Sequence, residues 1–120
     1  MSKEPFDKTQ GEPLARKRCI PCEGGVLPLT KPEAEKLLAE LNGWMLVDEA
    51  HLLAKTFRFK NFVETMKFVN EVARIAEEEG HHPDMSVSYN TLGIELTTHS
   101  INGLSENDFI LAAKVDEIKK

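Results

Sequence analysis

Residues 62–83, FVETMKFVNEVARIAEEEGHHP, are the segment around which the other elements of the chain can be arranged. Apolar residues recur there every three or four positions, which predicts a helix over 62–79 that ends at Gly80 and Pro83. The row that we expect to face the core consists of Phe62, Met66, Val69, Ala73 and Ala76. A second apolar row consists of Phe68, Val72 and Ile75. So broad an apolar surface predicts either a deeply buried helix or one that also packs against another subunit.

A shorter helix is expected before this segment. Thr30-Lys31-Pro32-Glu33 has the pattern of a capping box, in which each terminal side chain accepts from the backbone N–H of the other residue. The apolar residues that follow at helical spacing are Ala34, Leu37, Leu38 and Leu41. Asn42-Gly43 is expected to end the helix, because glycine readily adopts the left-handed conformation.

Short alternating segments predict four strands, at 44–47, 52–59, 85–89 and 94–98. Polar turns at 48–50 and 90–93 join them in two pairs. A last helix begins at Ser105, where Asp108 in the first turn interacts favourably with the helix dipole. The order is therefore α-β-β-α-β-β-α. Since short links favour antiparallel pairs, we predict a layered α+β fold.

Length and composition indicate one domain, and the charge excludes some partners. The chain has 120 residues and a formal net charge of −5, and the region 1–28 holds four prolines and a Gly-Gly pair. We therefore expect an irregular arm at 1–28 and a domain at 29–120. An acidic chain without a basic face is not expected to bind nucleic acid directly. No apolar run suits a signal peptide or a membrane span, so we expect no membrane partner.

The two cysteines lie in the arm, as Cys19-Ile20-Pro21-Cys22. This is half of a zinc knuckle, and His51 is the candidate for a further ligand, but a structural zinc site normally needs four. The surroundings do not predict the helix start of a thioredoxin-like motif. We interpret the pair as loop thiols that can form a disulfide on oxidation. Without an export signal, they favour a cytoplasmic location.

Three of the four histidines fall at the ends of predicted elements. His81 and His82 follow the long helix, and His99 follows the fourth strand. If the third and fourth strands pair, all three imidazoles meet at one edge of the sheet. Because imidazole exchanges protons near neutrality, such a cluster suits a reaction that needs both an acid and a base. Glu77 and Asp108 are candidates to orient these rings.

Two other interpretations of the histidines stay open at this point. Three histidines can hold a catalytic zinc ion. However, neighbours in an extended chain point to opposite faces, so His81 and His82 would not readily aim at one ion. Alternatively, the histidines are surface residues beside a proline turn. The residue pattern alone supports this interpretation and catalysis equally.

Several motifs occur together in the second half of the chain. They are Ala73-x-x-Ala76-Glu77-x-x-x-His81-His82-Pro83, Tyr89, Thr98-His99 and Gly103-Leu104-Ser105-x-x-Asp108, with Gly43-Trp44 and Phe57-x-Phe59-Lys60-x-Phe62 upstream. Together they resemble the signature of the pterin-4a-carbinolamine dehydratases over about residues 30–118. The arm resembles the N-terminal Cys-x-x-Cys extension of some bacterial-type and plant-type members.

This resemblance implies a four-stranded antiparallel sheet with helices packed on one face, and homodimers or homotetramers formed through helix 62–79. It implies a hydro-lyase that dehydrates 4a-hydroxytetrahydropterin, the 4a-carbinolamine, to quinonoid dihydropterin in tetrahydrobiopterin recycling. Water is lost without a change in oxidation state, so neither a metal nor a redox cofactor is expected.

The resemblance also implies roles for particular residues. His81 and His99 would act as general acids on the 4a-hydroxyl, and His82 would bind the pterin and take the N5 proton. The substrate-binding set would be Gly80, His81, His82, Thr97, Thr98, His99 and Ser100. The supporting set would be Glu77, Pro83 and Asp108.

A non-catalytic role is the alternative that the resemblance itself raises. Some proteins of this fold are transcriptional co-activators that stabilise transcription-factor dimers, and others look like assembly factors for the carbon-fixing enzyme. Such proteins keep or lose the histidines. Retention of all three histidines in this chain favours chemistry.

Overall fold

A computed structural model describes residues 13–20 and 27–119 of the chain. Its elements in order are η2 (Leu14–Arg16), α1 (Lys31–Leu38), β1 (Met45–Val47), β2 (Leu52–Arg58), α2 (Phe62–Glu79), β3 (Asp84–Ser88), β4 (Thr91–Leu96), η3 (His99–Ile101) and α3 (Glu106–Asp116). The predicted α+β class and α-β-β-α-β-β-α order are confirmed. Within the ranges described, no helix is both long and apolar enough to span a membrane.

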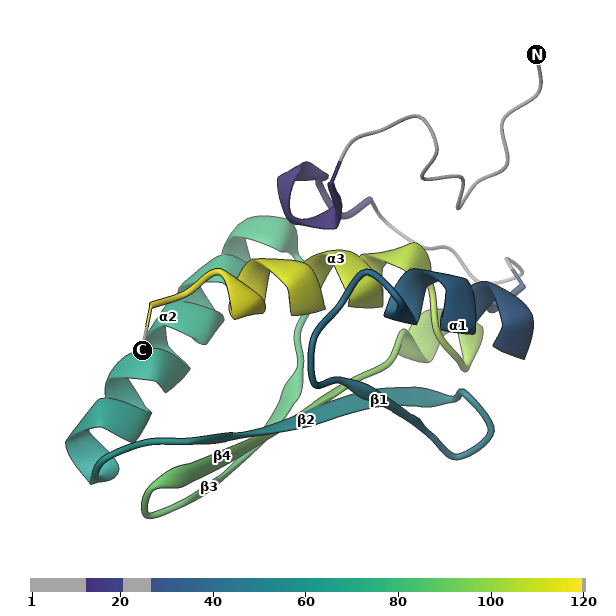
Figure 1. The fold of residues 1–120 in the computed structure, drawn as a ribbon. Helices are drawn as coiled ribbons and strands as arrows, with labels where there is room; N and C mark the ends of the chain where they lie inside the picture. The colour runs from purple at the N-terminus through teal and green to yellow at the C-terminus, as the bar shows by residue number, and fades with distance from the viewer. Residues whose placement is uncertain (1–12, 21–26, 120) are drawn as a thin grey trace.

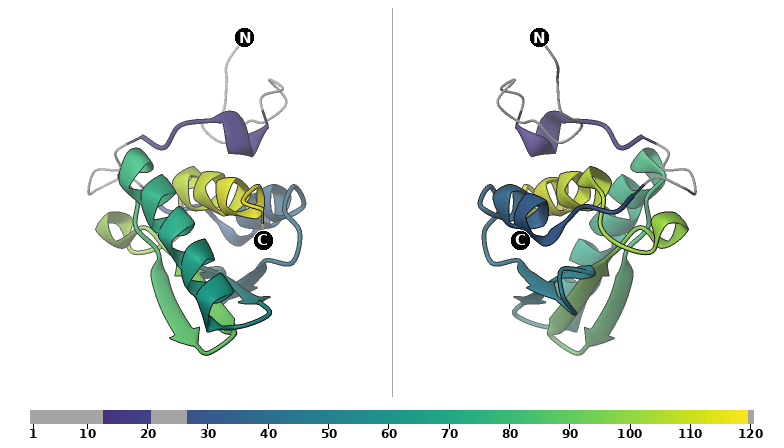
Figure 2. Two further views of the ribbon diagram at one scale, coloured as in Figure 1. Left: turned by 90° about the vertical axis from the view of Figure 1, so that its left-hand side faces the viewer. Right: turned by 90° about the vertical axis from the view of Figure 1, so that its right-hand side faces the viewer.

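The four strands form one sheet in the order β1-β2-β4-β3, and each neighbouring pair is antiparallel. The three α-helices lie on one face of this sheet (Figure 1), an arrangement that the side views in Figure 2 also show. In the register of β3 and β4, Asp84 lies opposite Glu95. The chain that enters β3 therefore runs beside the chain that leaves β4.

The helix ends follow local side-chain chemistry. The predicted capping box of α1 is confirmed, with Glu33 Oε1 accepting from the Thr30 backbone N–H at 2.9 Å. Helix α2 ends at Gly80, which has a φ of 66°. The N–H of His81 donates to the Ala76 carbonyl at 3.2 Å, as in a Schellman motif. This motif fixes the direction in which the chain leaves α2 and enters the His-His-Pro segment.

Helix α2 faces the core with a different row from the one predicted. Its buried side chains are Thr65, Phe68, Val72, Ile75 and Ala76. In the predicted row Ala76 is buried and Val69 packs partly buried against the core, but Phe62 is 48% exposed and Ala73 is also exposed, so the assignment of this row as the core face was wrong. Phe68 packs against Phe57 and Phe59 at centroid distances of 4.9 and 5.0 Å. Both rows are apolar at helical spacing, so periodicity could not show which one meets these rings.

Several boundaries also differ from the prediction. Helix α1 ends at Leu38 instead of continuing to Leu41, whose N–H donates to Leu38 in a tighter three-residue turn. Tyr89, expected in the third strand, has a φ of 48° and belongs to the turn. Strand β4 consequently begins at Thr91 rather than at 94.

Part of the predicted irregular arm lies against the domain. Leu14 in η2 is 2% exposed and belongs to the hydrophobic core, and η2 lies beside α3. Lys114 Nζ donates to the Ala15 carbonyl at 2.8 Å, and Lys17 pairs with Glu106 at 2.8 Å. The division of the chain at residues 28 and 29 stays a prediction.

The burial of α2 can be tested with matched substitutions on one helix. Phe68→Ala should lower the free energy of unfolding by about 3–5 kcal/mol, because it leaves a cavity beside the rings of Phe57 and Phe59. Phe62→Ala, at a position half-exposed in the single chain, should cost less than about 1 kcal/mol when unfolding is measured at a concentration where the protein is monomeric. Urea unfolding followed by circular dichroism measures both values. Equal losses would contradict the assignment of the core row.

Candidate active site

A pocket of about 450 Å³ lies where the end of α2, the end of β4 and the start of α3 meet. Its lining residues are Cys19, Ile20, Glu79, Gly80, His81, His82, Thr97, Thr98, His99, Ser100 and Asn107. All the residues expected to bind substrate are among them. The antiparallel pairing of β3 with β4 accounts for this convergence, because it brings the two histidine segments to one edge of the sheet.

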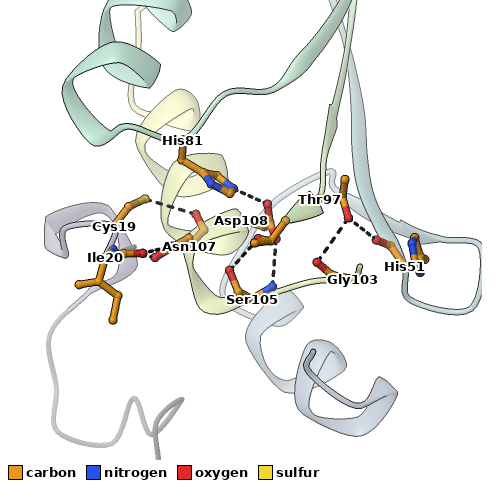
Figure 3. A network of polar contacts seen from close by, with 10 residues as sticks. Cys19, Ile20, His51, His81, Thr97, Gly103, Ser105, Asn107 and Asp108 are labelled. Carbon is orange, nitrogen blue, oxygen red and sulfur yellow. Dashed lines mark hydrogen bonds and ion pairs between the residues drawn. The ribbon is translucent and has the colours of Figure 1, made fainter. Parts of the chain in front are cut away.

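His81 is held by a buried carboxylate behind it. Its Nε2 lies 2.6 Å from Asp108 Oδ1, and the side chains are 12% and 0% exposed respectively. Figure 3 shows the His81 ring directed at this carboxylate. Because a carboxylate only accepts, Nε2 carries the proton in this contact, and Nδ1 is the nitrogen left to exchange a proton.

Asp108 is itself fixed by two donors on its other oxygen. Oδ2 accepts from Thr98 Oγ1 at 2.8 Å. It also accepts from the Ser105 backbone N–H at 3.0 Å (Figure 3). The second bond belongs to the capping box that starts α3. One carboxylate therefore joins the start of α3, the end of β4 and the His81 ring. Asp108, a predicted candidate to orient a ring, contacts His81.

His82 has a looser partner. Its Nε2 lies 2.7 Å from Glu77 Oε2, but the two side chains are 61% and 78% exposed. Water and salt screen such a pair, so it contributes at most about 1 kcal/mol. Neither Glu77 nor Pro83 lines the pocket. Glu77 can orient the ring of His82 without holding it rigidly.

His99 is presented by a tight loop after β4. The Thr98 N–H donates to the Gly103 carbonyl at 2.9 Å, and Asn102 adopts a left-handed φ of 58° to close the loop. Thr97 Oγ1 donates to the carbonyls of His51 at 3.0 Å and Gly103 at 3.4 Å (Figure 3). These bonds secure the base of the loop, while the His99 side chain is exposed.

Four lining residues were not expected: Cys19, Ile20, Glu79 and Asn107. Asn107 forms two hydrogen bonds with the backbone of Ile20, which Figure 3 shows. Glu79 Oε1 accepts from the Cys19 backbone N–H at 2.8 Å. Sequence periodicity carries no signal for such contacts, because an arm without repeating structure has no face to assign.

Cys19 has the properties of a neutral thiol. Burial, together with the nearby carboxylates of Glu79 and Asp108, raises its pKa from 9.0 to about 12. Burial alone would raise the pKa of Glu79, but the Cys19 N–H and the charges of Lys114 and Arg18 hold it below its ordinary value. A zinc ligand would have to be a thiolate. The partner in the motif, Cys22, lies outside the described residues.

In the described part of the chain, no group of three or more His, Cys, Asp or Glu side chains is arranged to hold a metal ion. The lining includes three imidazoles and the hydroxyl-bearing residues Thr97, Thr98 and Ser100. Such groups can donate and accept protons and can bind a small polar heterocycle.

Comparison with known proteins identifies the class. Residues 27–118 match the family model described as pterin 4 alpha carbinolamine dehydratase, a class of hydro-lyase. The chain belongs to this family.

Curated relatives and solved structures agree with this assignment. A protein from Nitrosomonas eutropha, provisionally named pterin-4-alpha-carbinolamine dehydratase, is 59% identical over 86% of this chain and 90% of its own length. A protein of the same provisional name from Methylococcus capsulatus is 52% identical over 88% of this chain and 92% of its own length. A crystal structure of transcriptional coactivator/pterin dehydratase from Brucella melitensis aligns with a TM-score of 0.71 and 36% identity, over 74% of this chain and 95% of that one. A pterin dehydratase-like protein identified as a RuBisCO assembly factor in the alpha-carboxysome aligns with a TM-score of 0.54 and 26% identity, over 62% and 87%.

The state of Cys19 predicts slow alkylation. In a Cys22→Ser variant, iodoacetamide at pH 8 should modify native Cys19 about 10³-fold more slowly than the same thiol in urea, because the raised pKa lowers the thiolate fraction by that factor. Mass spectrometry over time gives both rates. Comparable rates in the native and unfolded protein would contradict the neutral, buried thiol.

Proposed function

We propose that this protein dehydrates a 4a-hydroxytetrahydropterin to the quinonoid dihydropterin, with histidines as the proton-transfer groups. The observation that carries the proposal is the presence of His81, His82 and His99, from two separate segments, in the lining of one pocket. The names of the similar proteins from Nitrosomonas and Methylococcus support the same reaction.

Loss of water from a carbinolamine needs a proton at the leaving hydroxyl and the removal of a proton from N5. His81 is suited to the first task. With Nε2 bonded to Asp108, the ring can carry a second proton on Nδ1, and the buried carboxylate at 2.6 Å balances the resulting charge. His81 can then donate from Nδ1 and regain the proton in the next cycle.

The other two histidines complete this scheme. His81 and His99 are alternative general acids, which reach the 4a-hydroxyl from either ring face, so one of them protonates it in each turnover. His82 contacts the pterin and accepts the N5 proton. Further substrate contacts come from Gly80, Thr97, Thr98 and Ser100, which line the same pocket. Glu77 orients His82, and Pro83 limits the freedom of the chain between His82 and β3. Because the oxidation state does not change, the scheme uses no redox cofactor.

We further infer that the protein assembles as a homodimer or homotetramer through helix α2. Phe62 and Val63 in this helix are 48% and 60% exposed, and the outward row contains other apolar side chains. Burying such side chains against a second copy would remove apolar surface from water. A cytoplasmic location remains a prediction from the sequence.

A protein-binding role is the second candidate. It is favoured by the structural likeness to a coactivator/pterin dehydratase and to a RuBisCO assembly factor. The two roles are separated by following dehydration spectroscopically with freshly generated carbinolamine. An enzyme accelerates the reaction far above the buffer rate, whereas a protein with only a binding role leaves the rate unchanged.

His99→Ala tests the assignment of a proton-transfer role. Since a positioned acid or base typically contributes 10²–10⁴-fold, kcat should fall by roughly that factor while the circular dichroism spectrum stays unchanged. His51→Ala is the matched control, because the contact of His51 with Thr97 uses its main-chain carbonyl. Normal turnover by His99→Ala would refute the role of this residue.

Asp108→Asn tests whether the buried carboxylate sets the protonation of His81. The single amide oxygen would face the two donors, Thr98 and Ser105, and the NH₂ group would then face His81 Nε2. The proton would have to move to Nδ1, so kcat should fall by roughly 10²–10³-fold. Asp116→Asn, which alters a carboxylate bonded to Trp44 and Lys55, should leave kcat unchanged. Equal kcat values for the two variants would reject this role.

A further inference from the structure

The arm reaches the pocket although it lies far from the histidines in sequence. Cys19 and Ile20 are part of the same lining as the three histidines. In the part of the arm from 13 to 20, contacts with the domain occur at several successive residues. A hydrophobic contact at Leu14, a carbonyl bond at Ala15 and an ion pair at Lys17 precede the pocket.

Asn107 binds the arm at the pocket through its side-chain amide. Its Oδ1 accepts from the Ile20 N–H at 3.0 Å, and its Nδ2 donates to the Ile20 carbonyl. The amide thus pairs with both polar groups of one residue's backbone, much as a neighbouring strand would. Asn107 is 5% exposed, so water competes little for these bonds.

Glu79 provides a second attachment next to the first. Its Oε1 accepts from the Cys19 N–H at 2.8 Å, and its side chain is 6% exposed. Its Oε2 lies 3.5 Å from both Arg18 and Lys114, which balance the charge. A charge-assisted bond in a nearly buried position is stronger than a neutral one. Two neighbouring residues of the arm are therefore held by two different elements, α2 and α3.

We propose that the Cys19–Ile20 segment is a preformed wall of the pterin pocket and that Asn107 is the positioning residue that holds this wall in place. The proposal rests on the dehydratase function proposed above. A wall that is already ordered before the ligand arrives saves the ligand the entropy cost of ordering it. The arm therefore contributes to affinity for the pterin, while proton transfer belongs to the histidines that line the same pocket.

The chemistry of the segment suits this role. The Cys19 thiol is neutral, because its pKa is raised to about 12, so it adds no charge beside an uncharged heterocycle. Ile20 is 67% exposed and adds apolar surface at the pocket. Pockets for small heterocycles commonly combine such apolar surface with a few polar groups.

Asn107→Leu in the full-length protein removes both bonds to Ile20 with little change in volume. We expect KM for the carbinolamine to rise about tenfold while kcat stays within about twofold. Hydrogen exchange at the Cys19 and Ile20 amides should become faster in the same variant. The matched control is Asn42→Leu, an exposed position outside the pocket, which should change neither quantity.

Ile20→Gly provides a second variant that is safe for folding, because the Ile20 side chain is largely exposed. It adds backbone freedom and removes apolar surface, so KM should rise about threefold with kcat unchanged. Faster exchange at Cys19 and Ile20 without any change in KM would overturn the proposal. A fall in kcat at constant KM would also overturn it, because Asn107 would then act on the chemical step.

The two proposals can fail separately. If the unmodified protein does not accelerate dehydration, the dehydratase proposal fails, and the wall is then judged by the Kd of a stable oxidised pterin measured by calorimetry. Weaker binding of that pterin by Asn107→Leu than by the unmodified protein and Asn42→Leu would support the wall. Equal binding would refute it, and absence of pterin binding by the unmodified protein would refute both proposals.

Discussion

The contact between His81 and the buried carboxylate of Asp108 is the interaction on which the site depends. A fully buried carboxylate is costly unless every oxygen has a donor, and here His81, Thr98 and Ser105 supply them. These donors come from the segment after α2, the end of β4 and the start of α3. The requirement to satisfy one charge therefore fixes three segments relative to each other, and the pocket lies at their junction.

The fold could largely be predicted from the sequence because its signals are local. Capping residues such as Thr30, the stop at Gly80 and the alternation in the strands each depend on a few neighbouring residues. The core face of α2 could not be predicted in this way. Its two apolar rows differ only in the residues that they pack against. Phe68 packs against the rings of Phe57 and Phe59, which come from an earlier part of the chain.

The same distinction applies to the pocket. The grouping of the histidines follows from strand pairing, so the sequence pattern could anticipate it. Asp108 could be named because it lies in the first turn of a helix that begins soon after His99. The roles of Asn107 and Glu79 in the pocket could not be predicted, because both side chains bind the backbone of the arm. Backbone groups are the same at every residue. Side chain-to-backbone contacts across the chain leave no pattern of residue types that a single sequence can reveal.

The burial of Asp108 also restricts how this molecule can change over evolutionary time. A lineage that replaced His81 would leave one oxygen of an inaccessible charge without a donor, at a cost above the roughly 1–3 kcal/mol of a neutral group. Because the net free energy of unfolding of a small domain is only about 5–15 kcal/mol, a few further destabilising mutations would then be enough to unfold it. Loss of the imidazole would destabilise the protein least in descendants that also replaced Asp108 with an uncharged residue. Stability thus gives the imidazole a reason to persist even where its chemistry is no longer under selection.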